Sequence, residues 1–135
     1  MRIAVIWAPA KKTASPDYAQ SLAKGMEKMG HRADLINAWH DNGMRLPGYE
    51  YIAAVTESIS AFSAKIPEAL PKILASASSL SGKKSAAFVK KGGFRTGRTL
   101  INAMRAMEKE GMIINWSDVL LNVNHAQAIG KQIGS

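Results

Sequence analysis

Short apolar runs alternate with segments of helical periodicity along almost the whole chain, and this order constrains the fold more than any other feature. The apolar runs span residues 2–7, 33–37, 51–55, 84–89 and 112–115, and the last can extend to 121. Between them, apolar residues recur at the spacing of amphipathic helices. This alternation predicts β–α–β units with right-handed crossovers, and hence an α/β fold with a mostly parallel sheet covered on both faces.

Several helix boundaries carry start or stop signals. The run Ser15-Pro16-Asp17 predicts an N-cap, a first-turn proline and a first-turn acid, and Gly30 ends the helical pattern that follows. Further helices are expected over residues 67–79 and 124–133. The helix that follows residue 97 is expected to bury one face, made of Leu100, Ile101, Met104 and Met107.

The run 51–55 is apolar on both faces, which is typical of a strand in the centre of a sheet. In doubly wound sheets, ligands bind beyond the carboxyl ends of the strands, at the point where the strand order reverses. The loops in which a site is expected are therefore 8–15, 56–63 and 90–97.

The composition is that of a globular protein, with 135 residues, 47% of them hydrophobic and 21% charged. This length suits one domain over residues 1–135. No segment is continuously apolar for the ~18 residues that a membrane span needs, and the first residues do not resemble a signal peptide, so a cytoplasmic protein is expected. The absence of cysteine excludes disulfides and thiolate ligands, and with three histidines no metal site is expected.

The formal net charge of +8 favours an anionic partner. A small anionic ligand such as a phosphate, an acidic protein, nucleic acid or a lipid surface would each satisfy this charge, and so would a merely solvated basic surface. Nucleic acid is not expected, because aromatic and basic residues do not interleave on a recognisable binding module.

The glycine-rich segment Gly92-Gly93-Phe94-Arg95-Thr96-Gly97-Arg98-Thr99 is one residue from the phosphate-binding pattern G-x-x-x-x-G-K-[ST]. Arg98 replaces the diagnostic lysine, and a planar guanidinium has a different reach. A nucleotide hydrolase is therefore not predicted, and the glycines are expected to allow close approach or mobility. A receiver domain is not predicted either, because the ends of the first and third strands lack its aspartates.

The residues after the first strand suggest a family. They read Trp7-Ala8-Pro9-Ala10-Lys11-Lys12-Thr13-Ala14-Ser15, and similar matches extend through "GYEYIAAVTES", "IPEALPKIL", "GKKSAAFVKKGG" and "LINAMRAMEKEGMII". Over nearly its whole length the chain resembles the flavodoxin-like superfamily, and its opening is closest to the flavodoxin-like FMN reductases, whose first loop is of the type G-S-P-R-x-x-G-N-[ST]. Pro9 and Ser15 match that pattern. Ala8, Ala10 and Thr13-Ala14 depart from it.

The resemblance implies a three-layer sandwich with a five-stranded parallel sheet of order 2-1-3-4-5. It also implies a protein that binds FMN and acts in electron transfer or flavin-dependent reduction. The phosphate would bind at the first loop, through backbone and hydroxyl groups at a helix N-terminus. The residues implied in FMN binding are Ala8, Pro9, Lys11, Lys12, Thr13, Ala14, Ser15, Ser58, Ile59, Ser60, Ala61, Phe62, Lys90, Lys91, Gly92, Gly93 and Phe94.

Three aromatic residues are candidates for the walls of a flavin site, namely Trp7, Phe62 and Phe94. Trp7 and Phe62 are equally compatible with an ordinary core, and Phe94 with an exposed loop. No catalytic acid or base is assigned, because flavin itself would carry the chemistry, and whether the protein is an enzyme is left open. An acidic redox partner would suit the basic loops. The alternative is a flavodoxin-fold protein without flavin, whose basic edge binds an acidic protein or another phosphorylated ligand.

Overall fold

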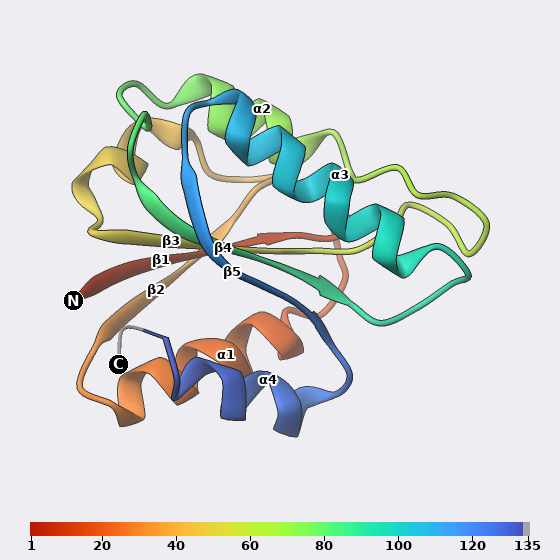
Figure 1. Ribbon diagram of the computed structural model, residues 1–135, viewed down its shortest axis with the longest axis horizontal. Coiled ribbons are helices and arrows are strands. Elements are labelled where there is room, and N and C mark those ends of the chain that lie inside the picture. The colour runs from red at the N-terminus through yellow and green to blue at the C-terminus, as the bar shows by residue number, and fades with distance from the viewer. Residues whose placement is uncertain (134–135) are drawn as a thin grey trace.

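The computed structural model describes residues 1–133 as a three-layer α/β sandwich. A parallel five-stranded sheet of order β2-β1-β3-β4-β5 forms the middle layer, as predicted. Helices α2 and α3 cover one face and α1 and α4 cover the other (Figure 1). The strands are β1 (Arg2–Ala8), β2 (Arg32–Asn37), β3 (Tyr51–Thr56), β4 (Lys84–Lys90) and β5 (Ile113–Leu120). The helices are α1 (Asp17–Lys28), α2 (Ala69–Ser76), α3 (Thr96–Lys109) and α4 (Val123–Gly130).

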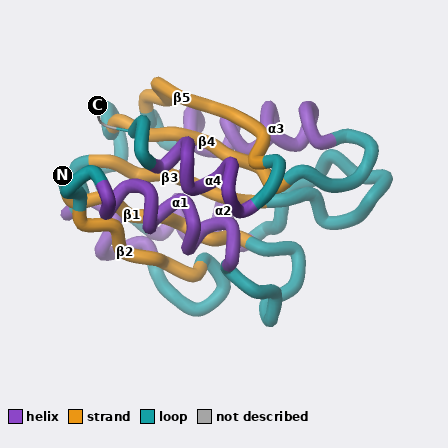
Figure 2. The backbone as a smooth tube through the Cα atoms, turned by 90° about the horizontal axis from the view of Figure 1, so that it is seen from below, coloured by secondary structure: helices purple, strands orange, loops and turns teal. Residues whose placement is uncertain are grey.

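The two central strands divide the core into two halves by their side-chain alternation. On β1, Ile6 points toward α2 and α3, whereas Val5 and Trp7 point toward α1 and α4. All six residues of β3 are buried, which confirms its central place in the sheet. Figure 2 shows α1 and α4 side by side over one face of the sheet. The continuous apolar pattern of these strands thus follows from burial on both faces.

Three local features differ from the sequence-based expectations. Ser15 does not cap α1: Pro16 occupies the N-cap, because its carbonyl oxygen accepts the first helical hydrogen bond from the Gln20 N–H. Ile101 does not lie on the packed face of α3 and is 42% exposed. The connection after β2 contains a short 3-10 helix, Gly43–Gly48, which sequence periodicity did not reveal.

The Tyr51 side chain allows a prediction about stability at alkaline pH. Tyr51 is 4% exposed, its hydroxyl donates a hydrogen bond to Asn115 Oδ1, and burial raises its pKa to about 12. An unfolded tyrosine loses its proton near pH ~10, so between those values the unfolded chain ionises before the native one does. We therefore expect stability to fall as pH rises from about 10 to about 12.

Tyr51→Phe has no phenolic proton and should lose less stability than the wild type over this interval. Urea unfolding at a series of pH values measures the difference. Equal pH slopes for the two proteins would contradict it.

Candidate functional site

The carboxyl ends of β1, β3 and β4 lie next to one another at the point where the strand order reverses. The buried Thr56 hydroxyl donates a hydrogen bond to the Ala8 carbonyl oxygen, with an O–O distance of 2.7 Å. This contact ties the end of β3 to the end of β1. The loops that leave β1, β3 and β4 therefore start from a rigid platform, at the position where ligands bind in doubly wound folds.

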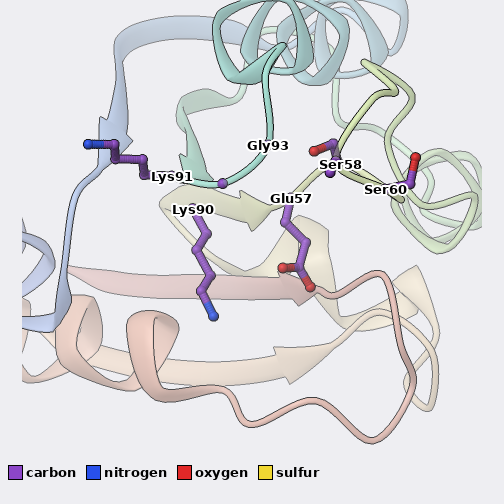
Figure 3. Close-up of a pocket in the computed structure, with 8 residues that line it drawn as sticks. Glu57, Ser58, Ser60, Lys90, Lys91 and Gly93 are labelled. Carbon is purple, nitrogen blue, oxygen red and sulfur yellow. The ribbon is translucent and has the colours of Figure 1, made fainter.

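A cavity of about 200 Å³ lies at this edge, between the loop after β3 and the loop after β4 (Figure 3). It is smaller than the ~300–1,000 Å³ that is usual for sites of drug-sized ligands. Its lining combines one carboxylate, two hydroxyls, two lysines and glycine backbone, from Glu57, Ser58, Ser60, Ala61, Lys90, Lys91, Gly92 and Gly93.

The two loops beside the cavity are joined directly. The Phe94 N–H donates to the Ala61 carbonyl oxygen at an N–O distance of 2.8 Å, and the Phe62 and Phe94 rings stack with centroids 5.2 Å apart. Gly93 permits this approach: its φ is +74°, and a Cβ atom there would lie 2.8 Å from the Ala61 carbonyl oxygen. Substitution at Gly93 would be strained for both reasons.

The first loop, between β1 and α1, is held by an aromatic residue that the sequence analysis did not single out. The half-buried Trp39 donates its indole Nε1–H to the Pro9 carbonyl oxygen at 2.7 Å, and the Lys12 ammonium lies 5.2 Å from the centroid of the Trp39 ring. Beyond it, the exposed Thr13 and Ser15 hydroxyls make no hydrogen bond within residues 1–133. The N-cap residue Pro16 provides no side-chain hydrogen bond to α1, and the first-turn Tyr18 N–H donates to Asp17 Oδ1 at 2.9 Å.

The first loop is also linked to the cavity. The Ala10 N–H donates to Glu57 Oε2 at an N–O distance of 2.9 Å. The predicted set of residues did not include Glu57, although it is the one carboxylate in the three loops 8–15, 56–63 and 90–97. Its being the single acid in these loops could have marked Glu57 in the sequence, because all other charged residues of the three loops are basic.

Most cations of this edge are not neutralised by acids. The Lys90 ammonium lies 4.8 Å from the centroid of the Tyr18 ring on α1. The side chains of Lys91, Arg95 and Arg98 are exposed, and none of them forms an ion pair with a described residue. The edge thus presents positive charge to a ligand or partner.

The structure divides the sequence-predicted residues into three groups. Seven line the cavity: Ser58, Ser60, Ala61, Lys90, Lys91, Gly92 and Gly93. Three others are exposed at its rim or beyond it: Ile59, Phe62 and Phe94. The residues of the first loop do not line this cavity and meet it only through the Ala10–Glu57 contact: Ala8, Pro9, Lys11, Lys12, Thr13, Ala14 and Ser15.

Trp7 lies in the core between the sheet and the α1–α4 layer, so it is not a wall of the cavity. Its indole Nε1 has no hydrogen-bond partner among the described residues. Across residues 1–133, no helix is long and apolar enough to cross a membrane. The same residues contain no cluster of three or more His, Asp or Glu side chains that could hold a metal ion.

Flavodoxins are among the solved structures with this architecture. An archaeal flavodoxin superposes with a TM-score of 0.74 at 18% identity, covering 98% of this chain and 96% of its own. Oxidised flavodoxin 1 from Bacillus cereus superposes with a TM-score of 0.71 at 14% identity, covering 96% of this chain and 95% of its own. Two-electron reduced flavodoxin from Megasphaera elsdenii superposes with a TM-score of 0.74 at 14% identity, covering 97% of this chain and 96% of its own. The fold is therefore flavodoxin-like.

The comparisons by sequence add no closer relationship. No protein-family model matches the chain, and no curated protein matches it. At 14–18% identity, the similarity to these flavodoxins shows the fold alone.

Proposed function

We propose that this flavodoxin-like protein binds FMN at the carboxyl edge of β1, β3 and β4 and takes part in electron transfer or flavin-dependent reduction. The observation that carries the proposal is the cavity beside the switch point, lined by the loops after β3 and β4. The structural neighbours support a redox role, since two of them are described as an oxidised and a two-electron reduced flavodoxin.

The donor groups of the first loop fit a phosphate monoester. Lys11 and Lys12 supply positive charge, and the Thr13 and Ser15 hydroxyls are exposed and have no partner within residues 1–133. The N-cap residue of α1 makes no side-chain hydrogen bond, and the helix dipole favours an anion at this end. One first-turn donor is already used, because the Tyr18 N–H donates to Asp17 Oδ1 at 2.9 Å. The chemistry of this loop therefore suits the phosphate of FMN.

The groups around the cavity fit a planar ring system. Phe62 and Phe94 present aromatic faces, and the backbone of residues 58–61 and 90–93 supplies hydrogen-bonding groups at the rim. The two rings now stack on each other, and the cavity is smaller than a usual ligand site. For either aromatic face to contact a flavin ring, the Phe62–Phe94 stack would have to open.

In this proposal the protein binds, orients and shields, and no side chain is assigned as a catalytic acid or base. Bound FMN would supply one- and two-electron transfer. The first loop would hold the anionic end, and the loops after β3 and β4 would fix the ring. Lys90 and Lys91 would favour electron-rich, negatively charged forms of a ligand in the cavity.

Titration with FMN tests the proposal directly. We expect purified protein to quench FMN fluorescence with a stoichiometry of one and to melt at a higher temperature when FMN is added. Riboflavin, which lacks the phosphate, should bind more weakly. Protein that is colourless as purified and whose melting temperature does not change with FMN would refute flavin binding.

A second function is favoured by the surface next to the cavity. Phe62 and Phe94 are 79% and 78% exposed, and the exposed cations Lys91, Arg95 and Arg98 lie in the loop that carries Phe94 and at the start of α3. Exposed aromatic residues within a charged rim are typical of protein–protein interfaces. In this alternative, the edge binds an acidic protein without flavin. This alternative would be favoured if the protein bound an acidic partner in a salt-dependent way and did not bind FMN.

A further inference from the structure

Glu57 places a carboxylate on the loop proposed to bind phosphate. The residue follows β3 directly, and its Oε2 accepts the Ala10 N–H at 2.9 Å. In Figure 3 the side chain points from the end of β3 toward the loop that leaves β1. Because the Thr56–Ala8 hydrogen bond fixes both strand ends next to it, this contact is part of the platform and not a chance approach of two surface groups.

The surroundings of Glu57 show that its charge is held by the loop amide rather than by a lysine. Glu57 is the only carboxylate among the residues that line the cavity. It forms no ion pair with a described residue, and the nearby Lys90 ammonium lies over the Tyr18 ring instead. A carboxylate has about four acceptor positions, yet the Ala10 N–H is the one hydrogen-bond donor that Glu57 has within residues 1–133. The first loop thus already binds an anion that belongs to the chain.

We propose that Glu57 is an internal competitor for the anionic end of the ligand. This inference rests on the proposed FMN binding, because it concerns the same loop. A single N–H cannot donate a full hydrogen bond to two anions, and two negative groups on one loop repel each other. In this proposal the phosphate takes the Ala10 N–H, so the carboxylate has to leave it first, and the affinity of the wild type is reduced by the fraction of molecules in which the Ala10–Glu57 contact is closed.

The chain provides a matched control for this residue. Glu50 precedes β3, as Glu57 follows it, and Glu50 Oε1 also accepts a backbone N–H, from Arg2 at 3.1 Å. The two glutamates make the same type of contact at opposite ends of one strand. Glu50→Gln therefore repeats the change in charge and in hydrogen bonding far from the proposed phosphate loop.

The experiment compares the wild type with Glu57→Gln, Glu57→Ala and Glu50→Gln, each checked for folding by thermal melting. Without ligand, amide hydrogen exchange at Ala10 should become about tenfold faster in Glu57→Ala. FMN should bind Glu57→Ala about tenfold more tightly than the wild type, and Glu57→Gln should bind with intermediate affinity. Glu50→Gln should bind FMN as the wild type does.

The outcomes separate the two proposals. If the wild type binds FMN and Glu57→Ala binds it equally or more weakly, the competitor role is wrong and flavin binding stands. If neither binds FMN, flavin binding is wrong, and inorganic phosphate becomes the deciding probe. A shift of the Ala10 amide resonance by phosphate in Glu57→Ala alone would then support competition at this loop. The competitor role would be overturned if phosphate shifted the Ala10 amide resonance equally in the wild type and in Glu57→Ala. It would also be overturned if amide hydrogen exchange at Ala10 were the same in the two proteins.

Discussion

Replacing Gly25 with valine is expected to separate α1 from α4 and to destabilise the protein by about 3 kcal/mol or more. A Cβ atom at Gly25 would lie 2.1 Å from the Gln127 carbonyl oxygen and 2.9 Å from the Lys131 backbone nitrogen. Both obstacles are backbone atoms, so no change of side-chain rotamer can relieve the overlap. The two helices would have to move apart, which opens the core that they cover.

The same contact can be tested from its other side. A Cβ atom at Gly130 would lie 2.1 Å from the Leu22 carbonyl oxygen. Gly130→Val should therefore produce a similar loss, and thermal unfolding should show a fall in Tm of roughly 10 °C for either variant. Gly97→Ala is the control, since Gly97 lies in α3 with open space around it and alanine there should stabilise the helix by up to about 1 kcal/mol. A Gly25→Val protein with the same Tm as the wild type would refute the close packing of α1 on α4.

The regular elements could be predicted because local chemistry and tertiary packing agree in them. The run 51–55 is apolar on both faces, and β3 is indeed buried throughout. Gly30 was expected to end the first helix, and its φ of +89° requires a residue that tolerates the left-handed region. The alternation of such elements leaves few topologies for a chain of this length, and the flavodoxin-like strand order is among them.

The errors arose where packing depends on partners that are distant in sequence. α3 packs through the buried residues Thr99, Ala103 and Met107, so a pattern built on large apolar residues placed Ile101 on the wrong face. Small and weakly polar residues let a helix approach a sheet closely, yet they carry little hydrophobic signal. The start of the 3-10 helix Gly43–Gly48 is anchored by a hydrogen bond from the Gly43 N–H to Ser76 Oγ, 33 residues away.

The candidate site shows the same limit. Sequence reasoning selected the loops after β3 and β4, and seven of the residues it named line the cavity. It did not select Glu57, because the role of that side chain depends on its hydrogen bond with the Ala10 N–H, which is 47 residues away. It also missed Trp39, whose indole holds the first loop at Pro9. The sequence can indicate which loops meet at an edge, but it cannot show which of their groups are already paired.

The largest functional effect is expected from reversing the charge of the first loop. Lys11 and Lys12 are exposed there, and the phosphate of FMN carries ~1.5–2 negative charges near pH 7 by analogy with other phosphate monoesters. In Lys11→Glu/Lys12→Glu, two attractions become two repulsions, each worth about 1 kcal/mol or more for charges in close approach at a protein surface. FMN affinity should therefore fall about a hundredfold or more, and the loss should shrink at high salt.

Two controls connect this loss to the anionic end of the ligand. Lys24→Glu/Lys28→Glu makes the same change in net charge on exposed positions near the other end of α1, and screening at physiological salt should keep its effect on FMN affinity below about threefold. Riboflavin has no phosphate, so its affinity should be nearly equal in the wild type and in Lys11→Glu/Lys12→Glu, which also shows that the variant is folded. If FMN bound Lys11→Glu/Lys12→Glu as tightly as the wild type, its phosphate would have to bind elsewhere. The basic loop after β4 would then be the remaining positively charged segment at this edge.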